Sequence, residues 1–382
     1  MTKKSDTPAI RFKGFTDTWE QRKLGELALF NPKDELPQIF EYVDLESVVG
    51  TEMLSHRTEV KSSAPSRAQR LAHAGDLFYQ TVRPYQKNNY LFERPDNNYV
   101  FSTGYAQMRP YVDGYFLLSL VQSERFVKVV LDNCTGTSYP AINANDLAEI
   151  EVAAPSDESE AQKIGTIFRS IDNLITLHQR KYDKLTNVKK SMLEKMFPKN
   201  GSNVPEIRFK GFTEAWEQRK LGELCNITTG KLDANAMVSD GQYDFYTSGI
   251  DVFKIDVAAF EGPAITIAGN GASVGYMHLA DGKFNAYQRT YVLTDFLADR
   301  QFLNVAIGNE LPNKIQEEVR GSGIPYIVLN MLTDLAIPFP SHEEQYAIGV
   351  YFQQLDNLIT LHQRELEKLK NIKKSCLENM FV

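Results

Sequence analysis

The sequence contains little cysteine, since its 382 residues include only Cys134, Cys225 and Cys376. The cysteines form no C-x-x-C pair, and the six histidines are not clustered. This spacing argues against a disulfide framework and against a zinc site. We therefore expect three reduced, mostly buried thiols and no metal site in this chain.

Long apolar runs are also absent. No stretch approaches the ~20 apolar residues that a membrane-spanning helix needs, and the positively charged residues 1–8 are not followed by an apolar segment. The sequence therefore predicts a cytoplasmic protein that makes no contact with a membrane.

The chain lacks the excess of positive charge that is typical of nucleic-acid-binding proteins, since its formal net charge is −7 and its pI is about 5.6. Residues 178–199 nevertheless contain seven basic side chains against two acidic ones. This local excess indicates either phosphate contact or an ordinary solvated helix surface. The overall charge thus argues weakly against a nucleic-acid partner.

Motifs of catalysis are missing as well. We find no N/D-P-P-aromatic motif of an adenine methyltransferase and no G-x-x-x-x-G-K-S/T phosphate loop. The glycine-rich residues 269–276 do not have the G-x-G-x-x-G spacing of a dinucleotide site. A nuclease or an independent methyltransferase would need such a loop or clustered carboxylates, so the sequence predicts a protein without a catalytic centre.

The chain does contain a long internal repeat. Residues 10–27 and 207–224 differ at only two positions, and residues 168–197 match residues 352–381 at twenty of thirty positions. Residues 198–205, between the two copies, are turn formers without apolar periodicity. The order is therefore motif, variable segment and helix, twice over.

The variable segments, roughly residues 28–154 and 225–339, can be aligned only at their ends, where residues 136–140 match residues 321–325. Short apolar runs punctuated by Gly, Asn, Pro and Asp give both segments β character. We expect a mixed, largely irregular sheet with helical decoration in each. The repeated parts of the two halves are near-identical, whereas the middles of the variable segments are not. We therefore interpret the repeated parts as a common scaffold and the middles as regions with different functions.

Two helices of about 33 residues, each roughly 50 Å long, are predicted where the longer repeat lies. Apolar residues alternate in steps of four and three and are interrupted only at Lys189 and Lys373, which is typical of a coiled-coil seam. Ser341 and Glu344 have the spacing of a capping box at the second helix start. Either direction of pairing is topologically possible, and a pseudo-twofold between the halves favours antiparallel helices.

The seam includes a histidine in each copy. A polar residue at such a position can set the register of the helices, and a ligand role is the alternative. The predicted seam residues are Ile164, Ile171, His178, Leu185, Ile348, Leu355, His362 and Leu369.

Three loop segments carry the polar side chains of interest. Residues 80–90 concentrate amide and basic side chains interleaved with aromatics, and residues 269–276 and 285–289 offer flexible backbone, hydroxyls and amides. Amide and basic groups of this kind form paired hydrogen bonds with adenine and guanine edges. Ordinary surface loops have a similar composition, so a purely structural role is the alternative for each residue. The candidate DNA-contacting residues are Gln80, Arg83, Tyr85, Gln86, Lys87, Asn88, Tyr105, Thr137, Ser138, Asn270, Ser273, Tyr276, Asn285, Tyr287, Gln288, Arg289 and Ser322.

The repeated residues 19–27 and 216–224, together with the Leu-Ile-Thr-Leu-His-Gln-Arg segment of both helices, resemble the scaffold of HsdS proteins, the specificity subunits of type I restriction-modification enzymes. Residues 136–143, Gly-Thr-Ser-Tyr-Pro-Ala-Ile-Asn, are similar to part of their target-recognition domains. The resemblance covers nearly the whole chain.

This resemblance implies a bipartite double-stranded DNA target, with each half bound by one domain and the helices setting the gap. Half-sites about one helical turn apart, roughly 34 Å, suit two domains on a stiff spacer. Two modification subunits would bind S-adenosylmethionine and methylate adenine, and restriction subunits would use ATP and Mg²⁺. No cofactor is then expected in this chain. A coiled-coil adaptor that does not bind DNA is the alternative.

These expectations define an α+β fold with a pseudo-twofold internal repeat, in which two β-rich domains are separated by two long helices forming an antiparallel coiled coil. The predicted divisions are a first target-recognition domain at 1–155, a central spacer helix at 156–197, a linker at 198–205, a second target-recognition domain at 206–340 and a C-terminal spacer helix at 341–382.

Overall fold

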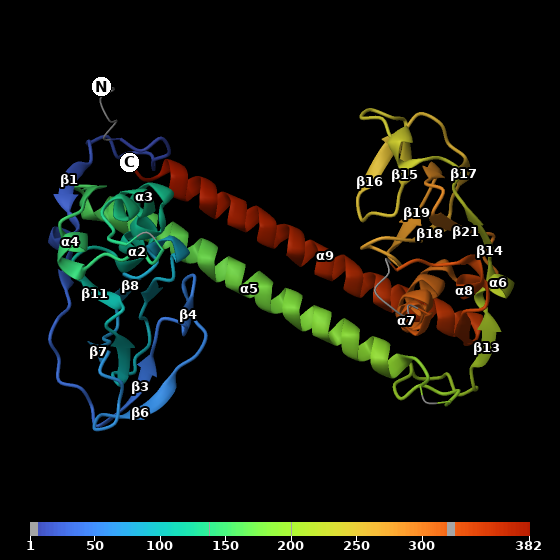
Figure 1. The fold of residues 1–382 in the computed structure, drawn as a ribbon, viewed down its shortest axis with the longest axis horizontal. Coiled ribbons are helices and arrows are strands. Elements are labelled where there is room, and N and C mark those ends of the chain that lie inside the picture. The colour runs from blue at the N-terminus through green and yellow to red at the C-terminus, as the bar shows by residue number, and fades with distance from the viewer. Residues whose placement is uncertain (1–6, 137, 200, 319–324) are drawn as a thin grey trace. The chain divides into compact units, whose positions relative to one another are not determined.

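The computed structural model describes the chain in four stretches, residues 7–136, 138–199, 201–318 and 325–382. The chain forms two compact units, the first made of Met1–Gln179 with Arg364–Val382 and the second of Arg180–Gln363. Each unit contains one β-rich domain and one half of each long helix (Figure 1). The predicted α+β class with two β-rich domains is confirmed.

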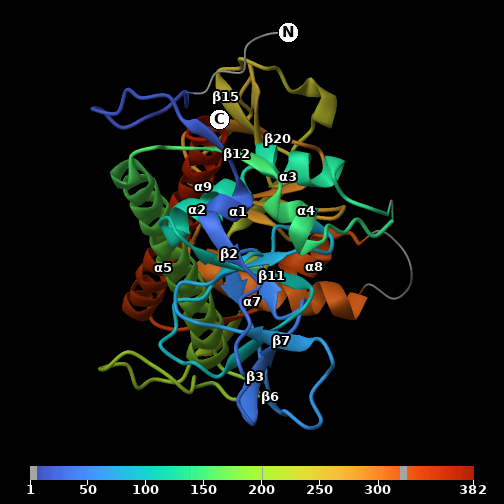
Figure 2. The ribbon, with the colours of Figure 1, turned by 90° about the vertical axis from the view of Figure 1, so that its left-hand side faces the viewer.

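The first β-rich domain is built on two four-stranded sheets, with strand orders β2-β11-β8-β9 and β6-β3-β10-β7, and on the two-stranded pairs β1-β12 and β4-β5. Strands β3, β6 and β7 lie at one end of this unit and the β1-β12 pair lies at the other (Figures 1 and 2). Its elements are β1 (Glu20–Lys23), α1 (Leu24–Leu27), β2 (Ala28–Phe30), β3 (Ile39–Val43), β4 (Val48–Val49), β5 (Glu52–Met53), β6 (Arg57–Val60), β7 (Ala68–Leu71), β8 (Leu77–Gln80), η1 (Pro84–Gln86), β9 (Tyr90–Leu91), β10 (Tyr99–Ser102), β11 (Tyr105–Pro110), α2 (Gly114–Gln122), α3 (Glu124–Asp132), α4 (Ala144–Ala148), β12 (Glu151–Ala154) and α5 (Glu158–Met196).

The second β-rich domain has two four-stranded sheets with orders β14-β21-β18-β19 and β16-β15-β20-β17, and the two-stranded pair β13-β22. Its elements are β13 (Glu217–Lys220), α6 (Leu221–Leu224), β14 (Asn226–Thr229), η2 (Ala234–Ala236), β15 (Tyr243–Tyr246), β16 (Val252–Ile255), β17 (Phe260–Glu261), β18 (Ala264–Ala268), β19 (Met277–Ala280), β20 (Lys283–Ala286), β21 (Thr290–Thr294), α7 (Arg300–Glu318), α8 (Leu329–Thr333), β22 (Ala336–Phe339) and α9 (His342–Asn379).

The two β-rich domains have the same topology although their middles cannot be aligned by sequence. The first sheet of each has the corresponding strands in the same order, and in the second sheet β3 runs parallel to β10 as β15 does to β20. The remaining pairs in these four-stranded sheets are antiparallel in both domains. The internal repeat therefore extends through the variable segments.

A central strand shows why dissimilar sequences reach this fold. All four residues of β8 are buried, with Leu77 and Tyr79 in one apolar cluster and Phe78 in another. The equivalent β18 is also buried throughout, and it places Ile265 and Ile267 together in a single cluster. Successive side chains of a strand point to opposite faces, so any alternating set of apolar residues of suitable volume satisfies both cores.

The long helices pair antiparallel within each unit. In the first unit Lys373 of α9 binds Asp172 of α5 at 2.6 Å, and the Phe168 and Phe381 rings lie 5.8 Å apart. As residue number rises along α5 it falls along α9. In the second unit Lys189 pairs in the same way with Asp356. The lysines that interrupt the apolar pattern thus each bind an aspartate of the opposite helix.

The predicted seam residues face the interior to different degrees. Ile164, Ile171, Ile348 and Leu355 are buried, and all of them except Ile171 belong to the clusters next to the β-rich domains. The other four, His178, Leu185, His362 and Leu369, are half-buried. Burial along the helices is therefore greatest where they meet the domains.

Each domain core is completed by the C-terminal end of a helix from the other copy of the repeat. Phe381, after α9, packs with Trp19 and Phe116 in the first unit. In the second unit Phe197, after α5, packs with Trp216 and Phe352. The near-identical helix ends therefore serve equivalent positions in the two units.

The shared N-terminal motif fastens each domain to the start of its helix. Arg208 forms two hydrogen bonds of 2.7 Å with Glu344, which is 1% exposed. The backbone amide of Glu344 donates to the Ser341 hydroxyl at 3.4 Å, so Ser341 caps α9 as predicted. The Glu344 carboxylate binds Arg208 instead of completing a capping box, because a buried guanidinium is the stronger partner.

The three cysteines are free thiols, of which Cys225 is buried and the other two are half-buried. Burial raises the pKa of Cys225 to about 12. In the stretches that the structure describes, no helix combines the length and apolar character of a membrane span.

Candidate nucleic-acid interface

The predicted contact residues of the first domain gather around one hairpin loop. Residues 81–89, here called the first hairpin loop, connect β8 to β9. The Arg83 amide donates to the Pro140 carbonyl at 2.8 Å, and the Ile142 amide donates to the Thr81 carbonyl at 3.0 Å. The loop is therefore bonded to the shared segment near residues 136–140, which the sequence identified as a common end.

Further hydrogen bonds hold the backbone of the first hairpin loop. The Gln80 amide donates to Asn89 Oδ1 at 2.9 Å, the Gly50 amide donates to Asn88 Oδ1 at 2.8 Å, and the Gln122 side chain donates to the Lys87 carbonyl at 2.9 Å. A loop anchored from several elements presents its remaining side chains in a defined geometry, which is what base recognition requires.

Several predicted side chains of this loop face outward. Tyr85 and Gln86 are exposed. The Arg83 guanidinium lies over the Tyr139 ring, 4.5 Å from its centroid. The Lys87 ammonium binds Glu124 at 2.6 Å. The structure thus brings Arg83, Tyr85, Gln86 and Lys87 together on one loop.

Two predicted residues of the first domain are structural instead. Gln80 is 3% exposed, and its side-chain amide donates to the Val82 carbonyl at 2.6 Å and to Gln86 Oε1 at 2.9 Å. Tyr105 is 1% exposed and donates to the Asp44 carbonyl at 3.2 Å, and burial raises the pKa of its phenol. Because their polar atoms are buried, we leave both out of the candidate interface. Asn88 also supports the loop, through the Gly50 amide described above.

The second domain has a matching arrangement. Its second hairpin loop, residues 269–276, connects β18 to β19. The Gly271 amide donates to the Pro325 carbonyl at 3.2 Å, and the Ile327 amide donates to the Gly269 carbonyl at 2.7 Å. These are the counterparts of the two bonds in the first domain, so both loops are held by the same attachment.

The predicted side chains of the second domain spread over two neighbouring loops. In the second hairpin loop Tyr276 is exposed, Ser273 is half-buried, and the Ser248 hydroxyl donates to Asn270 Oδ1 at 2.6 Å. The turn before β21 exposes Gln288 and Arg289 and leaves Tyr287 half-buried. The Gly269 amide donates to the Arg289 carbonyl at 2.9 Å, which joins the two loops into one surface.

Asn285 is not part of that surface. It is 3% exposed, and its side chain donates to the Val257 carbonyl at 2.8 Å and accepts from the Ala286 amide at 2.9 Å. We therefore assign it a structural role. Ser138 is exposed beside Tyr139, and the predicted residues Thr137 and Ser322 lie outside the described residues.

Sequence reasoning missed two exposed tyrosines next to the loops. Tyr139 is 64% exposed and Tyr326 is 61% exposed, and each adjoins the proline that anchors its loop. Aromatic rings of this kind can stack on bases or hold a guanidinium. The sequence could have indicated both tyrosines, because each is a neighbour of Pro140 or Pro325, and these prolines belong to the matched ends of the variable segments.

His278 on β19 was also missed. Its imidazole is half-buried between the Tyr246 and Tyr276 rings, with centroid separations of 5.1 and 4.9 Å. Burial lowers the pKa of His278, while a hydrogen bond with the Gly249 backbone opposes this. The imidazole therefore packs against Tyr276 and helps to hold this residue at the end of the second hairpin loop.

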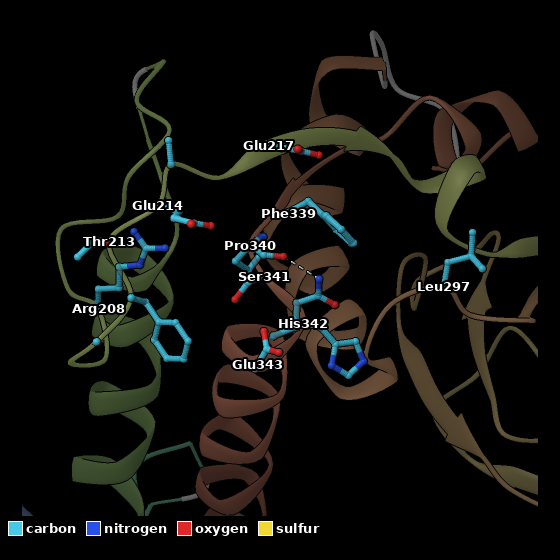
Figure 3. Close-up of a pocket in the computed structure, with 14 residues that line it drawn as sticks. Arg208, Thr213, Glu214, Glu217, Leu297, Phe339, Pro340, Ser341, His342 and Glu343 are labelled. Carbon is cyan, nitrogen blue, oxygen red and sulfur yellow. Dashed lines mark hydrogen bonds between the residues drawn. The ribbon is translucent and has the colours of Figure 1, made fainter.

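A cavity of about 700 Å³ lies away from the hairpin loops, where the shared motif meets the start of α9. Arg208 and Glu214 line it on the motif side, and His342 and Glu343 on the helix side (Figure 3). Its walls belong to the repeated scaffold. Among the described residues no group of three His, Cys, Asp or Glu side chains could hold a metal ion, here or elsewhere.

Comparisons with known proteins agree with this architecture. The crystal structure of a type I restriction-modification system S subunit from M. genitalium matches with a TM-score of 0.72 at 16% identity, covering 98% of this chain and 99% of that chain. This likeness supports the fold.

Curated relatives are specificity subunits. The type I restriction enzyme EcoDI specificity subunit of Escherichia coli is 41% identical over 157 residues, which are 41% of this chain and 34% of that protein. The chain thus spans about a third of the length of that relative. The MjaVIII specificity subunit of Methanocaldococcus jannaschii is 25% identical over 301 residues, 69% of this chain and 68% of that protein.

The family model described as the type I restriction modification DNA specificity domain matches this chain twice. The matches cover residues 54–187 and 213–371, which are most of both repeats and contain both hairpin loops. The two matches account for more than half of the chain and follow its internal repeat. The chain therefore belongs to the family of type I restriction-modification DNA specificity proteins.

Proposed function

We propose that this chain is the DNA sequence-specificity subunit of a type I restriction-modification complex and that it binds a bipartite target, one half per β-rich domain. The observation that carries this proposal is the equal attachment of two dissimilar loops. The bonds to Pro140 and Pro325 hold the loops in the same way, whereas the side chains they present differ. A common frame with different contact groups is what recognition of two different half-sites requires.

The chain itself would be non-catalytic and without a cofactor. Two modification subunits would bind S-adenosylmethionine and transfer the methyl group to adenine N6, and restriction subunits would supply ATP- and Mg²⁺-dependent cleavage in the cytoplasm. Partner subunits would also provide part of the positive charge that this chain, with a net charge of −7, lacks. Membership of the specificity family favours this proposal over an adaptor that does not bind DNA.

The test is to map methylated adenines in a host that carries this chain and its modification subunit. We expect one bipartite motif, and we expect replacement of residues 28–154 by another variable segment to change one half of it. Substitution of Gln288 or Arg289 by alanine should alter only the other half. A purified chain that modifies DNA without added subunits, or a domain exchange that leaves the motif intact, would contradict the proposal.

In the purified complex, DNA binding should weaken steeply as salt is raised, because contacts to phosphate release counterions. Binding should be tightest with the modification subunit present. An adaptor would instead bind its protein partners and show no salt-sensitive affinity for DNA.

A further inference from the structure

The two hairpin loops share left-handed backbone positions as well as the same attachment. The strands that carry them close on equivalent pairs, Leu77 with Leu91 in the first domain and Ile265 with Leu279 in the second. The two residues of each pair are equally far apart along the chain, so the segments between them have equal length. Residue by residue, Arg83 then corresponds to Gly271 and Lys87 to Gly275.

Both loops place left-handed residues at these two positions. The φ angles are 54° at Arg83 and 56° at Lys87, and 84° at both Gly271 and Gly275. Glycine adopts this conformation without steric cost, whereas a residue with a Cβ does not. The first domain therefore keeps two long cationic side chains where the second uses the residue that the backbone favours.

Contacts within the first domain give one of these two cationic side chains, Lys87, a structural role. Lys87 binds Glu124 at 2.6 Å, and its carbonyl accepts the Gln122 amide at 2.9 Å. Arg83 has no such partner, since within the described residues its guanidinium makes no hydrogen bond or ion pair and only lies over the Tyr139 ring at 4.5 Å. Among the residues that the structure describes, no contact therefore explains the strained backbone at Arg83.

The position of the guanidinium over the Tyr139 ring limits how its N–H groups can point. A planar cation lying over an aromatic ring keeps its N–H edge free for an acceptor pair in the same plane. The acceptor pair that arginine meets most often in the major groove is O6 and N7 of guanine. Phosphate also accepts two hydrogen bonds from an arginine, but it binds a lysine as a point charge as well, so replacement of Arg83 by lysine distinguishes the two kinds of acceptor.

We infer that Arg83 is a specificity-determining residue that recognises a guanine edge in the half-site bound by the first domain, and that the second domain, with Gly271 at this position, recognises its half-site without such a contact. This inference rests on the proposed function. It assigns one base preference to one side chain of one loop.

The test uses the full chain assembled with its modification subunit and two variants, Arg83→Gly and Arg83→Lys. Thermal unfolding of Arg83→Gly should occur at the wild-type temperature or above, because glycine suits the left-handed backbone. Methylated-adenine mapping should show an unchanged second half-site and a loss of discrimination at one guanine of the first half-site, by about 5- to 150-fold. Arg83→Lys should weaken this discrimination, because a compact ammonium on a flexible stem lacks the planar fork that matches O6 and N7 of guanine.

A matched control is Asp295→Gly, which relieves a left-handed residue of φ 54° in an exposed turn of the second domain. It should leave both half-sites unchanged. An unchanged first half-site in Arg83→Gly, or wild-type discrimination in Arg83→Lys, would overturn the inference, the latter in favour of a phosphate contact. Failure of the proposed function would look different, since the wild-type complex would then give no bipartite motif.

Discussion

The Arg11 guanidinium forms a double hydrogen bond with the Glu160 carboxylate, with Nε–Oε1 at 2.6 Å and Nη2–Oε2 at 2.8 Å. Glu160 is 0% exposed and also accepts from Trp19 Nε1 at 3.2 Å. Arg208 and Glu344 repeat the ion pair in the second unit. The near-identity of residues 10–27 and 207–224 therefore has a physical cause, because both motifs must neutralise a buried carboxylate at a helix start.

Substitution Arg11→Ala should destabilise the first unit by about 3–5 kcal/mol, because it leaves Glu160 buried without its counter-charge. Denaturant unfolding of the whole chain would measure this loss. The matched control is Lys23→Ala, whose partner Glu149 is exposed like Lys23 itself, so little change is expected. Equal effects of the two substitutions would show that the Arg11 pair contributes no more than a surface pair.

Substitution Phe381→Ala should destabilise the first unit by about 3–5 kcal/mol, because it removes a buried ring from the contacts with Trp19, Phe116 and Phe168. Phe197→Ala should do the same in the second unit. Thermal unfolding is the measurement, with exposed Leu177→Ala as the control. If Phe381→Ala unfolds like Leu177→Ala, the helix end does not complete the core.

Much of the helical architecture could be predicted from the sequence. The repeat located both helices, and the interruptions at Lys189 and Lys373 proved to be the positions where each helix binds an aspartate of the other. Strand order could not be predicted, because pairs such as β3 with β10 join residues far apart in sequence. Neither the Leu77–Gln80 nor the Ala264–Ala268 segment contains information about its partners.

The sequence identified loops whose candidate residues the structure brings together, but it could not tell which of their side chains are exposed. Composition identified the loop that carries Arg83, since amide and basic groups are concentrated there. Composition could not show that Gln80, Tyr105 and Asn285 are buried, because the burial of a side chain at the end of a strand depends on the neighbouring strands. Tyr139 was missed because its relevance comes from the ring contact with Arg83.

The Lys373–Asp172 pair allows a test of helix register in the first unit. Both side chains are about one-fifth exposed, at 22% and 21%. Lys373→Asp and Asp172→Lys should each destabilise the unit by creating like charges, and the double variant should recover most of the loss. We expect a coupling energy of about 0.5–3 kcal/mol from the double-mutant cycle, measured by denaturant unfolding. Additive losses would mean that the two residues do not interact in solution.

His278 gives the second unit a predictable dependence on pH. Burial between Tyr246 and Tyr276 lowers the pKa of this histidine from its ordinary value of 6.5. As the pH falls below 6.5, the unfolded chain takes up a proton that the folded chain resists, so the free energy of unfolding decreases until the folded pKa is reached. His278→Gln should remove this part of the acid destabilisation.

Urea unfolding across that pH range would measure the effect. The slope of the free energy of unfolding against pH is compared between the two proteins, so that any constant difference in stability does not affect the comparison. The wild-type slope should be the steeper one below pH 6.5, because only there do the folded and unfolded chains differ in protons bound at residue 278. Identical slopes would mean that the imidazole is as accessible to protons in the folded unit as in the unfolded chain, and the tyrosine contacts would then not support the Tyr276 side of the loop.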